Sequence, residues 1–156
     1  MNINILKGGV SVFTRDCTIG GNRYTECIQQ NLGLTGEDAE LAKRGQLSGV
    51  DEAGLHSAVE TVDVEVATEI SRSFDYFRTM STEEADITRI VLSGGCAKIP
   101  TLPARITEQL GIEASVVNPF KSLDVSGLKM SPEELAEVAP AAAVVVGLAI
   151  RREGDR

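Results

Sequence analysis

The chain has 156 residues, of which 42% are apolar, and this length suffices for one ordinary domain with a hydrophobic core. Its formal net charge of −8 argues against nucleic acid as a partner, because phosphate binding needs clustered Lys and Arg. Aromatic residues make up only 4% and Trp is absent, so aromatic stacking surfaces for bases or sugars have little to build from.

Two short β-branched runs open the chain, over residues 2–6 and 10–17. Lys7-Gly8-Gly9 joins them, which is the sequence form of a β-hairpin. Since a strand starts without lead-in residues, we expect the sequence to begin partway through a larger domain, with its N-terminal portion truncated.

Three helices are predicted next. The first covers residues 22–32 and stops at Gly33, and the second covers 37–44 after a Thr35-x-x-Asp38 capping pattern. The third covers 55–80, where apolar residues recur every three or four positions. The polar residues on its other face predict a solvated surface, made of Glu60, Asp63, Glu65, Glu69 and Arg72.

The second half of the chain predicts a parallel crossover. A β-branched strand over 88–93 leads into a glycine-rich turn, a helix that Thr101 caps and Gly111 ends, and a strand over 114–117. In α/β sheets of this kind, ligands gather at the carboxyl ends of the strands. The glycine turn therefore lies where ligands bind.

Two further helices are predicted near the C-terminus. Ser131-Pro132-Glu133-Glu134 is a well-formed helix start, and a final slim helix begins near Pro140. The longest apolar run, residues 139–150, falls short of the roughly 20 residues that a bilayer span needs, so direct membrane insertion is not expected. The charged tail over 151–156 is expected to fray.

Catalytic and metal-binding constellations are scarce. His56 is the only histidine, has no evident partner and is predicted to be a surface residue. The cysteines Cys17, Cys27 and Cys96 lack the C-x-x-C spacing of zinc and redox motifs and are interpreted as reduced thiols of a cytosolic protein. No metal site is predicted.

The glycine turn, Ser93 to Pro100, offers the best candidate site. Gly94 and Gly95 let the backbone pass close under a flat ligand, where a Cβ would collide. A plainer interpretation is that they only allow a sharp reversal from strand to helix. The turn is not a Walker A loop, because Lys98 is neither preceded by Gly nor followed by Ser or Thr.

Three segments in order resemble elements of the actin, sugar-kinase and Hsp70 superfamily. Residues 90–100 resemble its adenosine motif, Ala39-Glu40-Leu41-Ala42-Lys43 resembles its Ala-Glu-x-x-Lys element, and 141–150 resembles its second connecting helix. In that element the Glu and Lys face the ribose and adenine. The resemblance implies a set of nucleotide-binding residues: Ser93, Gly94, Gly95, Cys96, Ala97, Lys98, Ile99, Glu40, Lys43 and Gly21.

Within the superfamily, four stretches resemble the PilM family of type IV pilus assembly proteins and its cell-division relative FtsA: residues 13–16, 19–26, 72–77 and 117–120. The implied fold is α/β, the actin-like (ribonuclease H-like) second domain, with a twisted sheet and helices plus a smaller, mostly helical subdomain. Residues 1–20 and 88–156 would bear the sheet, and 21–87 would form the helical part.

The resemblance implies the adenosine-side half of an ATP-binding scaffold on the cytoplasmic face of the inner membrane. Mg²⁺ and a PilN-like partner would bind through an N-terminal half, so no catalysis is expected from this chain alone. The alternatives are a fragment of a sugar-kinase-type phosphotransferase and a nucleotide-free interaction module. Cys96 and Thr101 depart from the family pattern, since glycines commonly stand at both positions.

Overall fold

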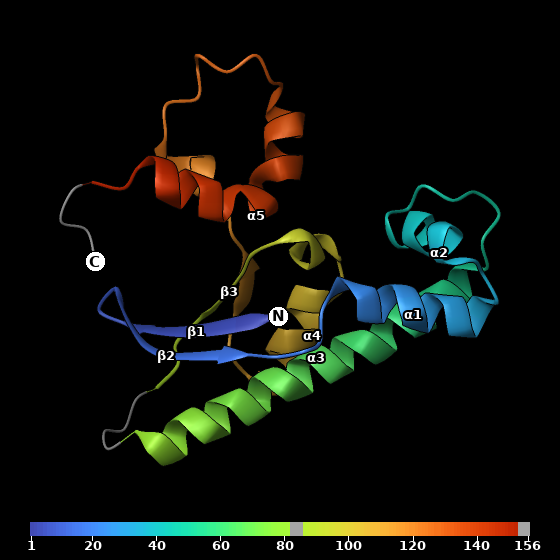
Figure 1. The fold of residues 1–156 in the computed structure, drawn as a ribbon, viewed down its shortest axis with the longest axis horizontal. Helices are drawn as coiled ribbons and strands as arrows, with labels where there is room; N and C mark the ends of the chain where they lie inside the picture. The colour runs from blue at the N-terminus through green and yellow to red at the C-terminus, as the bar shows by residue number, and fades with distance from the viewer. Residues whose placement is uncertain (82–85, 153–156) are drawn as a thin grey trace.

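The computed structural model describes residues 1–81 and 86–152. In this part of the chain helices predominate, and the strands form two sheets of two strands each. Figure 1 shows the long helix α3 (Glu52–Met80) along one side of the molecule, with the N-terminal hairpin beside it. Helix α5 (Pro132–Ala149) lies at the opposite side.

The hairpin is formed by β1 (Asn2–Lys7) and β2 (Val10–Asp16), which pair antiparallel as predicted. Gly8 and Gly9 have φ values of 59° and 84°, so the two-residue turn needs the conformational freedom of glycine. The register shifts between Ile5 and Leu6, where β2 carries one extra residue.

Three helices follow, as predicted: α1 (Gly21–Leu32), α2 (Gly36–Lys43) and α3. Gly33 closes α1 with φ 64°, and the Thr35 hydroxyl accepts a hydrogen bond from the Asp38 amide at 3.1 Å. The Asp51 carboxylate accepts a hydrogen bond from the Ala53 amide at 3.1 Å, so α3 begins at Glu52 rather than at residue 55.

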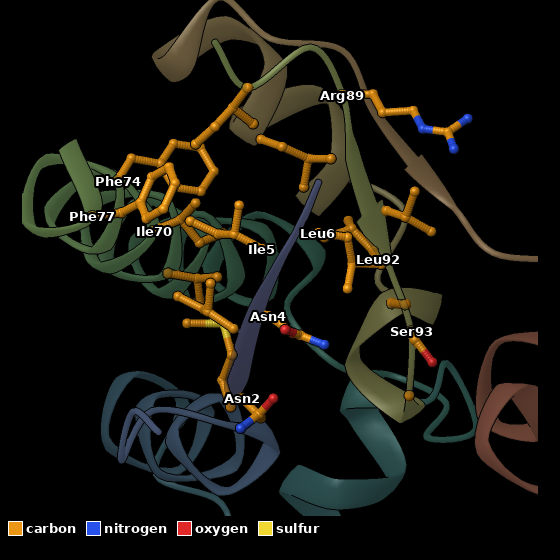
Figure 2. Close-up of a pocket in the computed structure, with 18 of the residues that line it drawn as sticks. Asn2, Asn4, Ile5, Leu6, Ile70, Phe74, Phe77, Arg89, Leu92 and Ser93 are labelled. Carbon is orange, nitrogen blue, oxygen red and sulfur yellow. The ribbon is translucent and has the colours of Figure 1, made fainter. Parts of the chain in front are cut away.

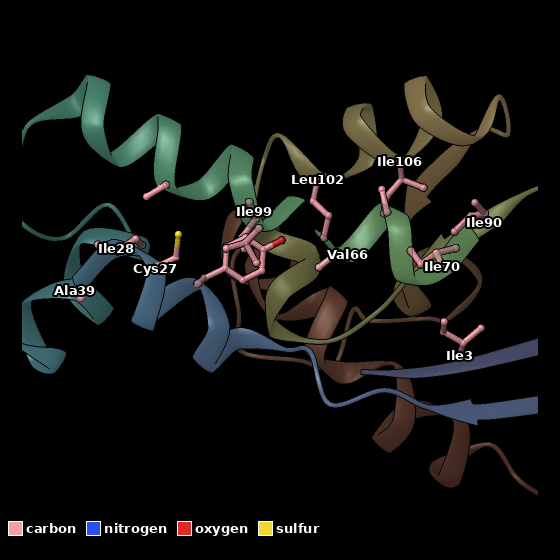
Figure 3. Packing of buried hydrophobic residues seen from close by; sticks show 14 of the residues in the cluster. Ile3, Cys27, Ile28, Ala39, Val66, Ile70, Ile90, Ile99, Leu102 and Ile106 are labelled. Carbon is pink, nitrogen blue, oxygen red and sulfur yellow. The ribbon is translucent and has the colours of Figure 1, made fainter. Parts of the chain in front are cut away.

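A continuous cluster of buried side chains forms the core (Figure 3). Helix α3 supplies its spine and packs against α1 and α4 (Leu102–Leu110). Ile28 and Ile106, on those two helices, are 0% exposed, and burying a side chain of this size stabilises the fold by about 1.5–3 kcal/mol. The boundaries expected near residues 20 and 88 between two subdomains stay a prediction.

The polar face of α3 is only in part the solvated surface that the sequence predicted, since Arg72 is exposed but Asp63 is buried. Asp63 is 1% exposed, and three glutamates beside it pair with arginines from three other elements. The pairs are Arg15–Glu69 from β2 at 2.7 Å, Arg23–Glu65 from α1 at 2.6 Å, and Arg105–Glu60 from α4. Each part-exposed pair contributes only about 0–1 kcal/mol, so their main effect is to fix the positions of these elements on α3.

The parallel crossover is confirmed. It consists of β3 (Ile90–Leu92), the 3₁₀ turn η1 (Gly95–Lys98), α4 and β4 (Ala114–Val116), and β3 pairs with β4 in parallel register. Thr101 precedes α4, but its side chain makes no cap hydrogen bond, so the predicted capping role is wrong. A second 3₁₀ turn, η2 (Pro119–Ser122), follows β4.

The expected single twisted sheet is not formed by these residues. Sheet β1-β2 and sheet β3-β4 are separate, and no backbone hydrogen bond joins them within the described ranges. A cavity of about 1090 Å³ is lined by β1, β3 and α3 instead. The hairpin and the crossover formed as predicted, whereas a continuous sheet would need backbone pairing between β1 and β3.

Helix α5 is continuous, whereas the sequence predicted two helices, the second beginning near Pro140. Its start is the expected capping box, in which the Ser131 hydroxyl accepts from the Glu134 amide at 3.2 Å and Glu134 accepts from the Ser131 amide at 2.7 Å. Pro140 lies inside the helix and removes one internal donor without ending it. From residue 153 on, the predicted frayed tail lies outside the described residues.

Candidate functional site

The glycine turn begins at the carboxyl end of β3 and is anchored to α5. Gly94 has φ 94° and ψ −179°, a combination that is essentially restricted to glycine. Its amide donates to the Pro140 carbonyl at 2.7 Å, and the Ser93 hydroxyl donates to the same oxygen at 3.1 Å. The backbone conformation therefore accounts for glycine at position 94.

Glycine at position 95 has no such explanation within the chain. Its φ does not lie in the left-handed region, and a Cβ built on it would meet nothing within 4 Å. The residues from Ser93 to Ala97 line the cavity of about 1090 Å³, and Figure 2 shows Ser93 at its edge. The turn thus presents open backbone to free space, which is what close approach of a flat ligand requires.

A polar network on α1 and α2 lies beside the turn. Lys43 Nζ on α2 donates to the Gly21 carbonyl at 3.2 Å and to the Thr25 hydroxyl at 2.9 Å, and it forms an ion pair with Glu40. The Thr25 hydroxyl donates to Glu40 Oε2 at 2.8 Å. Arg44 binds the other oxygen of Glu40, at 2.8 Å from Nη2. This network fixes Glu40 and Lys43 before any ligand binds.

Gly21 is the point where the turn and the network meet. A Cβ on Gly21 would lie 3.3 Å from Cys96 Sγ and 3.8 Å from Lys43 Nζ. The first of these distances is tighter than an ordinary contact, so the thiol would have to move for any larger residue. Three segments far apart in the chain therefore converge here, represented by Gly21, Lys43 and Cys96, and their predicted role in nucleotide binding stays a prediction.

Charge is distributed unevenly over this site. Hydrogen bonds from Lys43 and Thr25 lower the pKa of Glu40 to about 2, so it is ionised at neutral pH. Burial raises the pKa of the Cys96 thiol, against the opposing effect of the Lys43 ammonium. At neutral pH the site thus combines an ionised carboxylate with an uncharged thiol.

The other predicted site residues have different surroundings. Ala97 and Ile99 are 5% and 8% exposed, and Ile99 belongs to the core cluster. Lys98 extends toward α5, where its Nζ lies 3.8 Å from Glu137 Oε1. Glu40 and Lys43 do not line the cavity of about 1090 Å³, whereas the turn does.

Sequence reasoning missed a buried network behind the turn. Asp63 on α3 accepts hydrogen bonds from the Tyr24 hydroxyl at 2.7 Å and from the Thr101 hydroxyl at 2.5 Å. Burial, together with the hydrogen bond to Asp63, raises the pKa of Tyr24 above its ordinary value. The one available signal was position, because Asp63 directly follows Val62 on the apolar stripe of the helix.

Other chemistry finds little support in the described ranges. They contain no group of three or more His, Cys, Asp or Glu side chains placed to hold a metal ion. His56 is exposed, as predicted, and faces Glu60 on the same helix at 4.0 Å. None of the described helices is both long enough and apolar enough to cross a bilayer.

The described residues form a mixed α/β structure, mostly helical, with a glycine turn at the end of a parallel strand. Residues 1–153 match the family described as "Type IV pilus assembly protein PilM". The chain belongs to this PilM family, which confirms the resemblance.

A solved structure agrees with this assignment. The chain is similar to a structure described as "PilM-PilN type IV pilus biogenesis complex", with a TM-score of 0.79 and 29% sequence identity. The match covers 96% of this chain and 42% of that chain. The chain thus spans less than half the length of the solved relative.

Proposed function

We propose that this chain supplies the adenosine side of an ATP-binding cleft in a PilM-type pilus assembly scaffold. The observation that carries the proposal is the convergence of Gly21, the Glu40–Lys43 network and the turn at Cys96. Open space above Gly95 supports it further, because nothing else in the chain accounts for a glycine there. The site would bind nucleotide without supplying catalysis.

The residues present suit the nucleoside part of ATP. Backbone at Gly94 and Gly95 would lie under the base, and the Glu40 carboxylate could accept hydrogen bonds from ribose hydroxyls. Lys43 would keep that carboxylate ionised and in place. Hydrolysis needs phosphate-binding amides, a metal and an oriented water together, and we assign these to polypeptide outside the 156 residues.

Binding should be measured by calorimetric titration of ATP·Mg into the longest available form of the protein. Gly95→Val should weaken ATP binding at least tenfold by filling the open space above the turn. Gly127→Val is the matched control, since Gly127 also has open space around it and lies in a loop away from the site. The proposal would be refuted if wild type, Gly95→Val and Glu40→Gln bound ATP with equal affinity.

We infer the cellular setting from the family resemblance. A PilN-like inner-membrane partner would bind the part of a longer PilM protein that this chain lacks, which would place the scaffold at the cytoplasmic face of the inner membrane. The relative's description as a PilM-PilN complex supports this partner. Co-purification of tagged PilN with the longer protein, and not with the 156-residue chain, is the expected result.

A second candidate is a nucleotide-free interaction module, and Cys96 favours it. Its thiol stands where glycine is common and lies against Gly21, so it narrows the site. If the Cys96 side chain does no more than narrow the nucleotide site, Cys96→Gly should raise the affinity for ATP. Absence of ATP binding in both wild type and Cys96→Gly would favour the nucleotide-free module. No observation favours the sugar-kinase alternative.

A further inference from the structure

The Glu40 carboxylate already uses its full acceptor capacity within the chain. An ionised carboxylate offers about four lone-pair sites, shared equally between its two oxygens. Oε2 accepts from the Thr25 hydroxyl at 2.8 Å and from the Lys43 ammonium. Oε1 accepts from Nε of Arg44 at 2.9 Å and from its Nη2 at 2.8 Å. A ribose hydroxyl can therefore bond to Glu40 only if one of these donors leaves.

The donors on Oε2 are held firmly. Lys43 Nζ also donates to the Gly21 carbonyl at 3.2 Å and to the Thr25 hydroxyl at 2.9 Å, so all three ammonium protons are used. The Lys43 side chain is only 14% exposed. Separating it from Glu40 would leave a largely buried ammonium without its counter-charge, which is costly. A ligand is therefore not expected to displace the donors on Oε2.

The donor on Oε1 is held far less firmly. Arg44 is 61% exposed in its side chain, and among the described residues it alone supplies the hydrogen bonds to Oε1. It lies four residues after Glu40 at the end of α2, and exposed ion pairs of this spacing are weak. The buried residues of α2 are Ala39 and Ala42, so the packing of α2 against α1 (Figure 1) does not depend on the Arg44 side chain.

We propose that Arg44 competes with the ribose hydroxyls of a bound nucleotide for Oε1 of Glu40, and so determines how strongly the site prefers a hydroxylated ribose. Under the proposed function, on which this inference rests, the ribose hydroxyls donate to Glu40. On binding, the Arg44 guanidinium turns into solvent and the hydroxyls take its place. A nucleotide with ribose hydroxyls must therefore offset the lost Arg44 pair, whereas a nucleotide without them leaves the pair intact.

A comparison of two nucleotides isolates this competition. 2′,3′-DideoxyATP has the same base and phosphates as ATP but lacks both ribose hydroxyls. A change of protein charge acts on the two triphosphates alike, so it cancels in the ratio of their dissociation constants. The ratio of the dideoxyATP value to the ATP value therefore reports the contact between the ribose and Glu40.

The test is calorimetric titration of each nucleotide, with Mg²⁺, into the longest available form of the protein. Arg44→Met removes the competing guanidinium and keeps an aliphatic stem, so the ratio should rise about two- to fivefold, mainly through tighter ATP binding. Arg44→Lys keeps the charge but lacks the planar fork, so its ratio should lie between those of wild type and Arg44→Met. Arg72→Met is the matched control and should leave the ratio unchanged, because Arg72 is 69% exposed and pairs with Glu69 on α3.

The Arg44 side chain provides a second readout. In the ligand-free protein its Nε–H donates to Glu40 Oε1 at 2.9 Å, which protects this proton from exchange with water. In NMR spectra the exchange should quicken roughly threefold or more on saturation with ATP, and it should stay unchanged with 2′,3′-dideoxyATP. Arg44→Lys identifies the signal by its loss. Unchanged exchange on saturation with ATP would contradict the displacement of Arg44.

The calorimetric ratios separate a failure of this competition from a failure of the proposed function. If ATP binds but the ratio is unchanged in Arg44→Met, Arg44 does not compete with the ribose. A lower ratio in Arg44→Met would mean that Arg44 itself binds the ribose, and an equal rise in Arg72→Met would mean a general effect of charge; either result overturns the competition alone. If neither wild type nor any variant binds ATP, the proposed function is refuted, and the competition with it.

Discussion

Asp63→Ala is the substitution that most directly tests the buried network behind the turn. The carboxylate joins three elements, because Tyr24 lies on α1, Asp63 on α3 and Thr101 at the start of α4. In the described residues every buried side-chain nitrogen and oxygen has a hydrogen-bond partner. Alanine would leave the Tyr24 hydroxyl without its acceptor at a position that is 1% exposed.

The expected loss is about 2–4 kcal/mol of unfolding free energy. An unsatisfied buried hydroxyl costs about 1–3 kcal/mol, and the lost hydrogen bonds to a charged acceptor add to it. Thr101 contributes less, since it is only half-buried and water can replace Asp63. Burying the Asp63 carboxylate itself costs free energy of desolvation, and alanine removes that cost. The net loss of unfolding free energy is therefore smaller than the sum of the separate costs.

Urea unfolding followed by circular dichroism measures this loss. Asp63→Asn should lose only about 1 kcal/mol, because the amide can accept from Tyr24 and donate to Thr101. Glu65→Ala is the control on the same helix, where a part-exposed ion pair is removed at a cost below about 1 kcal/mol. If Asp63→Ala unfolds within about 0.5 kcal/mol of wild type, the carboxylate is not a stabilising part of the core.

Three further predictions concern the turn and the titrating groups. Gly94→Ala should lose about 1–3 kcal/mol in urea unfolding because of its φ of 94°, whereas Gly95→Ala should be nearly neutral; equal losses would contradict the backbone argument. The raised pKa of Tyr24 keeps its phenol protonated in the folded protein, whereas the phenol of the unfolded chain ionises near pH 10. The free energy of unfolding should therefore be constant below about pH 10 and fall above it by up to about 1.4 kcal/mol per pH unit. Tyr24→Phe should remove that part of the alkaline decline, and an identical decline would exclude Tyr24 as its source. The pKa of Glu40 is lowered from 4.5 to about 2, so its ionised carboxylate stabilises the fold above pH 4.5 and this contribution is lost as the pH falls toward 2. The unfolding free energies of wild type and Glu40→Gln should therefore converge between pH 4.5 and pH 2. A constant difference across it would refute the assignment.

Local features of the fold could be predicted from the sequence because their causes lie within a few residues. Thr35 caps a helix by binding the Asp38 amide, and Ser131 and Glu134 form their capping box across one turn. Gly33 ends α1 through its own backbone conformation. The hairpin follows equally from the two glycines at its tip.

Features that depend on distant partners could not be predicted in this way. Glu65 and Glu69 look like surface residues in a helical pattern, and only the fold shows Arg23 and Arg15 against them. A separate helix was predicted to begin near Pro140, yet α5 runs through this residue, whose carbonyl accepts a hydrogen bond from the distant Gly94 amide. Pairing between separate sheets is equally nonlocal, which is why the hairpin and the crossover were predicted correctly and the single sheet was not.

Cys96 and Thr101 stand at the two positions where the resemblance predicted glycine, and their side chains have different consequences for the site. Thr101 stays outside the space above the turn, because its hydroxyl donates to Asp63 and so links the start of α4 to α3. Cys96 lies on the side of the turn that faces Gly21, where its sulfur takes up room beside the polar network. Under the proposed function, Thr101 holds the residues after the turn against α3 and Cys96 narrows the opening, so a nucleotide would meet a site that is well positioned but tight. The ATP affinity of Cys96→Gly relative to wild type therefore measures how much the Cys96 side chain narrows the site, because Thr101 is unchanged in this variant.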